Sequence, residues 1–404
     1  MVWRLGIVLA IVLHGATNLQ AQLSANGQMT VRWSVPKEFP TGLQTVVPGT
    51  LSGSNPGGRT FLLHRSGQPD IPAQRVVGTH HVWFIAKVSE PSLGKTLEFR
   101  ATKYEGKEAV TIARKKDGFQ FSDDGRPVMF YQREPKSKEG KSTRANYIHP
   151  LFGLDGELLT QDFPDDHLHH RGVFWAWRQL YVGKERAGDP WINRDFLSVV
   201  KEADIVDQGP VFATLRVTVD WVSPQITDDA GKPMPIVRET TRIRLFHASA
   251  ESRFIDFEIR LKPLLPDVKI GGAENSRGYS GFTVRVKPPR EIELNDANGF
   301  LKEDSIGNVS RWADVSGLYD QNQGVTGVAI LSHPSLPEFP PNWLLRHYGM
   351  QNVVYPGRQP IALWADKPLV LRHRLVIHRG NVKKSRIPDH QKVYEAVRRD
   401  LTAP

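Results

Sequence analysis

The chain has 404 residues, 24% of them charged, with a formal net charge of +10. It has no cysteine, which excludes disulfides and thiolate metal sites, so any metal would rest on His, Asp or Glu. The basic residues are scattered and form tight clusters only at expected turns and near the C-terminus. A solvated basic surface explains this pattern better than an acidic polymer partner, and we expect no nucleic-acid partner.

The first 21 residues are typical of a secretory signal peptide. Arg4 supplies the positive charge, an apolar run extends from Leu5 to Leu13, and Ala21 is a small residue ahead of an expected cleavage point. No later stretch approaches the roughly 18 to 20 apolar residues that a transmembrane helix needs. We therefore expect an exported bacterial protein, periplasmic or extracellular, without a membrane span.

Residues 28–105 predict a small Ig-like β-domain. Short strand-like segments such as MTVRWSV and HVWFIAKV alternate with links rich in Pro, Gly and Ser. We place the boundary with the next domain near residue 105.

Residues 106–385 predict a large antiparallel two-sheet sandwich of the supersandwich type, so the fold class is all-β. In the stretch 211–221 (VFATLRVTVDW), apolar side chains share one face and mostly polar side chains share the other. The stretches 254–262 and 369–378 repeat this alternation, which is typical of long, half-buried strands. Strands of this length with little helical periodicity between them favour a sandwich over a parallel, helix-covered sheet.

The last segment, 386–404, predicts a short C-terminal helix and a tail. Its apolar residues Val393, Ala396, Val397 and Leu401 recur at helical spacing. We expect this helix to pack on the edge of the sandwich.

The stretch FPDDHLHHRG, residues 163–172, is the strongest candidate for chemistry. If it is extended, His167 and His169 point the same way and His170 points the opposite way, with Asp165 or Asp166 orienting one imidazole. Imidazole titrates near neutral pH, so such a pair can take or give a proton.

Nearby and distant segments supply further candidate residues. The stretch 273–282 and the proline-dense stretch 333–352 carry polar side chains on expected loops, where sites are often built. Guanidinium groups can bind carboxylates with two parallel hydrogen bonds. Tryptophan rings, including that of Trp191, can stack on a sugar ring. The predicted catalytic residues are His149, Asp166, His167, His169, His170 and Tyr348. The predicted substrate-binding residues are Asn146, Arg171, Trp175, Trp177, Glu274, Arg277, Tyr279, His333, Arg346 and His347.

The same histidines allow two other interpretations. Two or three His with an Asp are an accepted ligand set for zinc, iron or manganese, although this spacing is not diagnostic. Alternatively, the imidazoles bond buried backbone groups and the tryptophans fill the core. We predict no cofactor, with a divalent metal bound by His and Asp as the alternative.

Several of these segments resemble the PmoA-like family of exported bacterial proteins, which carries the label "methane oxygenase PmoA". The resemblance covers about residues 30 to 380 and is most specific at H-P-L-x-G (149–153) and D-H-x-H-H-R-G (166–172). Methane oxidation is excluded, because a membrane subunit of methane monooxygenase is a bundle of transmembrane helices. Relatives are common in polysaccharide-degrading bacteria, near sugar oxidoreductases, so the resemblance implies carbohydrate metabolism.

This resemblance suggests a specific reaction. In a 3-keto glycoside the proton on C2 is acidic, so a base such as His169 could remove it while the glycosidic oxygen leaves C1 with help from His149 or Tyr348. Hydrolysis would instead use two carboxylates, for which Asp166 and Glu274 are the best pair. The sequence thus predicts an exported protein that cleaves a glycoside where 149–171 meets 333–352. The alternatives are a non-catalytic carbohydrate-binding or envelope protein and a metal-dependent enzyme using His and Asp.

Overall fold

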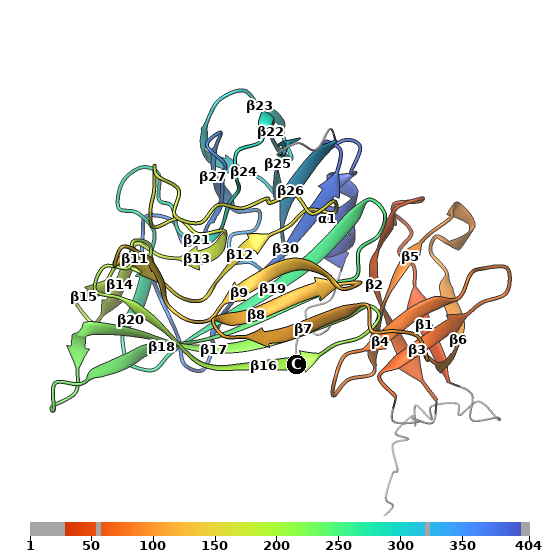
Figure 1. The fold of residues 1–404 in the computed structure, drawn as a ribbon, viewed down its shortest axis with the longest axis horizontal. Coiled ribbons are helices and arrows are strands. Elements are labelled where there is room, and N and C mark those ends of the chain that lie inside the picture. The colour runs from red at the N-terminus through yellow and green to blue at the C-terminus, as the bar shows by residue number, and fades with distance from the viewer. Residues whose placement is uncertain (1–28, 54–57, 320–323, 397–404) are drawn as a thin grey trace, which may run out of the picture.

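A computed structural model describes residues 29–53, 58–319 and 324–396 of the chain. The predicted signal peptide lies outside these residues, as do Val397 and Leu401 of the predicted C-terminal segment. Figure 1 shows a small β-barrel at one end of the molecule and two large antiparallel sheets that fill the rest. The all-β sandwich predicted from strand periodicity is therefore confirmed, together with its short C-terminal helix.

The N-terminal barrel closes in the order β1-β2-β5-β4-β3-β6. Its strands are β1 (Thr30–Ser34), β2 (Gln44–Ser52), β3 (Thr60–His64), β4 (Ile71–Arg75), β5 (His81–Lys87) and β6 (Thr96–Lys103), with a 3₁₀ helix at Glu90–Ser92. β6 pairs with both β1 and β3, which leaves no free edge. The strands lie within the predicted range, but they form a barrel and not the open two-sheet sandwich of an Ig domain.

The first large sheet has the order β24-β27-β28-β21-β13-β12-β9-β8-β7. Its strands are β7 (Val110–Lys115), β8 (Gly118–Asp123), β9 (Arg126–Gln132), β12 (Tyr147–Leu151), β13 (Val173–Ala176), β21 (Gly281–Arg285), β24 (Ser305–Val309), β27 (Asn342–Arg346) and β28 (Met350–Val354). This order brings β13 and β21 beside β28, although the three strands lie far apart in the sequence.

The second large sheet has the order β16-β17-β18-β19-β30-β26-β25-β22-β23. Its strands are β16 (Leu197–Asp207), β17 (Phe212–Thr227), β18 (Pro233–Phe246), β19 (Ser252–Pro263), β22 (Arg290–Asp296), β23 (Gly299–Leu301), β25 (Trp312–Leu318), β26 (Val325–Ser332) and β30 (Leu369–Arg379). The three segments read as long strands from their alternation are β17, β19 and β30. Their apolar faces belong to the core between the sheets.

Two smaller sheets and one helix complete the structure. The small sheets contain β14 (Gln179–Val182), β15 (Glu185–Gly188), β20 (Val268–Gly271) and β29 (Ile361–Ala362), and the hairpin β10 (Lys136–Lys138) with β11 (Lys141–Arg144). The helix α1 (Ile387–Ala396) places Val393 in the barrel core and Tyr394 against the outer face of the second sheet. The helix therefore joins the barrel to the sandwich, and none of the described helices is long and apolar enough to cross a membrane.

A buried carboxylate lies in the core between the two large sheets. Glu239 of β18 is 1% exposed, and its two oxygens accept four hydrogen bonds of 2.8 to 3.0 Å. The donors are Asn146 Nδ2, Trp175 Nε1, Trp221 Nε1 and Thr241 Oγ1. Burial raises the pKa of Glu239, and the four donors oppose that rise. The carboxylate links the two sheets, because Trp175 belongs to the first sheet, Asn146 directly precedes β12 of that sheet, and Glu239 belongs to the second.

Replacing Glu239 with Ala should lower the free energy of unfolding by about 4 kcal/mol, because four buried donors lose their acceptor at once. Urea denaturation measures this change. The matched control is Glu202→Ala, which removes an exposed glutamate from β16 in the same sheet and should cost less than about 0.5 kcal/mol. Equal, small effects in the two variants would contradict a structural role for the buried carboxylate.

Candidate functional site

The histidine-rich loop folds as two successive turns, not as a strand. The backbone N–H of His167 donates to the carbonyl of Pro164 at 3.1 Å, and that of His170 donates to the carbonyl of His167 at 2.8 Å. The expectation that His170 points away from His167 is therefore wrong. The turns stack the rings of His167 and His170 in parallel at 4.6 Å, and His169 lies edge-on at 4.6 Å from His170.

Tyr348 and Arg285 complete the group around His167. Tyr348, in the turn between β27 and β28, stacks on His167 with ring centroids 5.3 Å apart. Arg285 of β21 lies over the Tyr348 ring at 4.4 Å and donates to both oxygens of Asp166 at 2.7 and 2.9 Å. The second oxygen of Asp166 lies 3.0 Å from His167 Nδ1. We call Asp166, His167, His169, His170, Arg285 and Tyr348 the histidine cluster.

Aromatic side chains form the base of the histidine cluster. His170 contacts the rings of Phe174 and Trp191, each at 5.9 Å, and Trp191 contacts Tyr279 at 4.9 Å. Arg178 donates to the Tyr279 hydroxyl at 3.3 Å. Tyr279, predicted to bind substrate, thus lies within this group of rings, while Trp191 is almost fully buried.

Burial and neighbouring charges keep the imidazoles of His169 and His170 neutral. Burial lowers the pKa of His169 to about 3, and the positive charge of Arg144 adds to this effect. The pKa of His170 is lowered further by burial and by the neighbouring imidazoles. Burial also raises the pKa of Tyr348, so its phenol keeps its proton at neutral pH. The site therefore combines these two neutral imidazoles and a neutral phenol with fixed guanidinium charge.

Three buried donor or acceptor atoms of the cluster have no hydrogen-bond partner among the described residues. They are His167 Nδ1, which lies at ion-pair distance from Asp166, His170 Nδ1 and Arg285 Nη1. Buried polar groups in folded proteins are nearly always bonded. The unused bonding capacity makes the cluster a candidate site for a polar ligand.

His149 lies apart from the other predicted catalytic residues. Its Nδ1 atom is 3.0 Å from the hydroxyl of Thr160, and burial lowers its pKa to about 4. Among the described residues no ring contact or hydrogen bond joins it to the three imidazoles of the loop. The prediction that His149 acts with them is not supported by this geometry.

Four predicted substrate-binding residues are buried and structural. Asn146 and Trp175 donate to Glu239 in the core, and Trp177 donates to the carbonyl of Tyr355 at 3.0 Å. In β13, strand alternation turns Trp175 inward and Phe174 outward. The structure therefore places Asn146, Trp175 and Trp177 in the interior, where they bond protein groups and not a sugar at the surface.

Arg171, the fourth of these residues, is fully buried. It donates to Asp162 at 3.2 Å and to the carbonyl of Ser142, and it lies 3.3 Å from the centre of the Phe163 ring. It therefore attaches the histidine-rich loop to the β10–β11 hairpin and cannot clamp a substrate.

The remaining predicted binding residues lie outside the cluster. Glu274 is exposed and paired with Arg186 at 3.2 Å, and Arg277 is also exposed. Asp304 holds both Arg346, at 3.4 Å, and His347, at 3.0 Å. His333 is buried 5.3 Å from Tyr394 of α1. The two predicted segments meet only through His167 and Tyr348.

Sequence reasoning missed Arg285, Arg178 and Arg144. Arg285 is a charged residue in the otherwise apolar stretch GFTVRV, which is a usable signal for an outward-facing position. Its meeting with Tyr348 depends on the pairing of β21 with β28, which no local pattern reveals.

Residues 119–392 match the model of DUF6807, a family of unknown function. The chain belongs to this family. The matched range contains the whole histidine cluster and most of α1, and it excludes the barrel. No curated protein matches the chain.

Two solved structures from Enterococcus faecalis are similar to the chain. One is a protein in glycosyl hydrolase family 38, and the other is an α-mannosidase from strain V583. Each is 10% identical with a TM-score of 0.42, and each match covers 91% of this chain. The matches cover 46% and 45% of the two structures, so this DUF6807 chain spans less than half of their length.

A possible metal-binding group lies away from the histidine cluster. Within the described residues, one group of three possible ligands has its ligand atoms within 4.8 Å of one another, and it consists of Asp123, Asp124 and His247. His247 Nδ1 lies 2.6 Å from Asp123, which also accepts from the Ala248 N–H at 2.9 Å. Hydrogen bonds already engage Asp123, so this group forms an ion pair in the DUF6807 fold.

The His247–Asp123 pair should make stability depend on pH. The bond to Asp123 raises the pKa of His247 above 6.5 against the effect of burial. Burial raises the pKa of Asp123, but the bonds to His247 outweigh it and hold that pKa below 3.8. The ion pair therefore stabilises the folded protein fully between pH 3.8 and 6.5. This stabilisation is lost as pH rises through the folded pKa of His247, because the imidazole loses its charge. It is also lost as pH falls through the folded pKa of Asp123, because the carboxylate loses its charge.

The test is the difference in unfolding free energy between the native protein and His247→Gln. This difference should be largest near pH 5 to 6 and should shrink as pH rises above about 7. In an Asp123→Asn background the same substitution should produce no such trend. A difference that stays constant from pH 5 to 9 in the native background would contradict the ion pair.

Proposed function

We propose that this protein cleaves a glycosidic bond by acid–base elimination at the histidine cluster, after export from the cell. The observation that carries the proposal is the Asp166–His167 pair beside Tyr348, next to the unpartnered Nη1 of Arg285. The saccharide class and the elimination of a 3-keto glycoside come from the resemblance to the PmoA-like family, and export comes from the N-terminal sequence. The side chains of the cluster supply a candidate base and a candidate acid for that reaction.

His167 is the best base of the cluster. Asp166 lies at its Nδ1 atom, which favours the tautomer that leaves Nε2 free to accept a proton. Its side chain is 39% exposed, so a substrate can reach it. His169, first considered as the base, is a weaker choice because burial lowers its pKa to about 3.

Tyr348 is the best acid. Burial raises its pKa, so it holds its proton at neutral pH. Its hydroxyl donates to Met350 Sδ at 3.3 Å, and a thioether is a weak acceptor that a glycosidic oxygen can replace. The phenol also lies against His167, so the acid and the base are adjacent.

The proposed step on a 3-keto glycoside balances without a cofactor. His167 Nε2 takes the proton from C2, and the resulting enolate oxygen accepts a hydrogen bond from Arg285 Nη1. The C1–O bond then breaks with its electron pair on the glycosidic oxygen, which takes the proton from Tyr348. The products are a sugar with a C1=C2 double bond and a free alcohol.

Hydrolysis by two carboxylates fits the structure less well. Burial raises the pKa of Asp166, but the close contact with His167 and the hydrogen bonds from Arg285 outweigh it and keep that pKa below its usual value. Asp166 is therefore a poor proton donor. Glu274, its proposed partner, is exposed and paired with Arg186.

His167→Gln should reduce cleavage of a 3-keto glycoside by about a hundredfold or more, because the reaction loses its base. Tyr348→Phe should cause a loss of similar size, because the leaving oxygen loses its proton donor. Mass spectrometry of the products follows both, and circular dichroism confirms that the variants fold. His80→Gln, an exposed histidine of the barrel, is the matched control and should keep full activity.

The products separate the competing functions. An unsaturated sugar supports elimination, whereas products that have gained water would show hydrolysis and overturn the proposed step. Saturable sugar binding without turnover of any plain or 3-keto glycoside would show a binding protein. Full activity in His167→Gln would remove the histidine cluster from the chemistry.

A further inference from the structure

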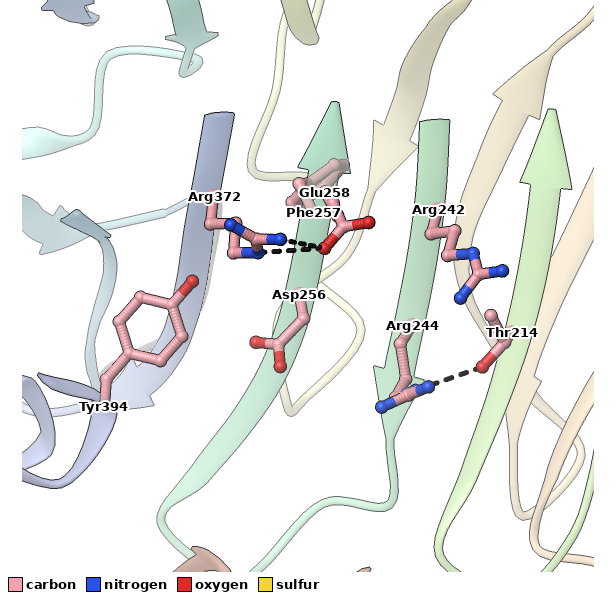
Figure 2. A pocket seen from close by; sticks show the side chains of 8 residues that line it. All are labelled: Thr214, Arg242, Arg244, Asp256, Phe257, Glu258, Arg372 and Tyr394. Atoms are coloured by element: carbon pink, nitrogen blue, oxygen red, sulfur yellow. Dashed lines mark hydrogen bonds and ion pairs between the residues drawn. The ribbon is translucent and has the colours of Figure 1, made fainter. Parts of the chain in front are cut away.

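A narrow hollow lies on the outer face of the second sheet, on the opposite side of the sandwich from the histidine cluster. It is open to solvent, and only about 20 Å³ of it is accessible to the centre of a water-sized sphere. Its side chains come from β17, β18, β19 and β30 and from Tyr394 of α1, as Figure 2 shows. The proposed glycoside cleavage does not use these residues.

Strand register arranges charged residues in two rows across the floor of this hollow. One row runs from Arg242 of β18 through Glu258 of β19 to Arg372 of β30. The next row contains, in register order, Thr214, Arg244, Asp256 and Arg374. Residues two apart on one strand share a face, so both rows face the same side.

Both carboxylates of the hollow are already bonded on the β30 side. Arg372 donates to Glu258 at 2.8 Å. Arg374 holds both oxygens of Asp256 at 2.6 and 2.8 Å. The Arg374–Asp256 pair is bidentate, which is the stronger kind of ion pair, whereas Arg372 contacts Glu258 through the single oxygen Oε2. Each carboxylate of the hollow is thus already paired with an arginine of β30.

Two arginines on the β18 side therefore lack a carboxylate partner. Arg244 donates only through its Nε atom, to Thr214 Oγ1 at 3.1 Å. Among the described residues no carboxylate oxygen lies within ion-pair distance of Arg242 or Arg244. Arg244 is nevertheless 7% exposed, and burial lowers its pKa to about 10, which leaves it charged at neutral pH. A charge with so little solvent favours a bound anion.

Tyr394 adds a third donor to this group. It is 1% exposed, and its hydroxyl points toward the hollow in Figure 2. Within the described part of the chain, that hydroxyl makes no hydrogen bond. Arg374 lies over its ring at 4.6 Å and fixes its position.

We propose that the hollow binds an oxyanion. Two guanidinium groups supply donors only, the phenol hydroxyl can donate as well, and each neighbouring carboxylate is already paired with an arginine of β30, which suits a carboxylate, sulfate or phosphate group. The hollow is too narrow for a whole sugar ring to enter, so an acidic saccharide would insert its charged group. The same chemistry would accept a free inorganic ion.

Isothermal titration calorimetry on the intact protein with phosphate, sulfate and glucuronate tests the proposal. At low ionic strength at least one probe should bind saturably, and Arg242→Gln should weaken that binding about tenfold or more. Tighter binding of glucuronate identifies a sugar acid as the ligand, and binding of phosphate or sulfate alone identifies an inorganic ion.

Arg238→Gln is the matched control, because it removes the same charge from the same face of β18. Arg238 is exposed and pairs with Asp220 at 2.9 Å, outside the hollow. The control should retain affinity within about twofold, and Arg285→Gln at the histidine cluster should retain it as well. No saturable binding of any probe, or equal losses in Arg242→Gln and either control, would overturn the proposal.

Tyr394→Phe keeps the test decisive if Arg242→Gln does not fold. It removes a single hydroxyl and should weaken binding about threefold to tenfold. Unchanged affinity in the folded variants at this site would show that the anion binds elsewhere.

Discussion

The hydrogen bond from Trp175 to Glu239 determines which way β13 faces, and the candidate site depends on that direction. With its tryptophan directed into the core, strand alternation turns Phe174 outward. Phe174 and Trp191 then form the base on which His170 lies. A register change of one residue in β13 would turn Trp175 outward and remove that base. The Glu239 carboxylate thus stabilises the sandwich and also fixes the orientation of β13, on which the position of the imidazoles depends.

The histidine cluster is held from two sides by arginines with different tasks. Arg171 is buried and bonds the loop to the β10–β11 hairpin, so it positions the imidazoles without touching a ligand. Arg285 holds Asp166 from β21 and keeps one N–H unpartnered. Each arginine keeps one buried nitrogen without a hydrogen-bond partner among the described residues, Nε in Arg171 and Nη1 in Arg285. The difference between them lies in their partners, because Arg171 binds the hairpin backbone and Asp162, whereas Arg285 binds the Asp166 carboxylate beside His167.

The sequence predicted those strands that have one buried face and one exposed face. It predicted β17, β19 and β30 because apolar and polar residues alternate along a strand whose two faces differ in burial. The barrel closure and the Arg285–Tyr348 contact could not be predicted, since both depend on strands that pair across long sequence distances. His333 was grouped with Tyr348 because both lie in one short segment. β27 spans five residues between them, about 16 Å, and carries them to different parts of the molecule.

Arginine outnumbers the available carboxylates at the outer hollow, and this gives the net charge of +10 a local meaning. At the histidine cluster Arg285 is paired with Asp166 and Arg171 with Asp162. At the outer hollow two arginines have no carboxylate bond among the described residues, and the one bond of Arg244 goes to a threonine hydroxyl. Charges with little solvent and no counter-ion destabilise a fold unless an anion joins them. The outer hollow, and not the paired histidine cluster, is therefore the place where the proposed anion would compensate charge.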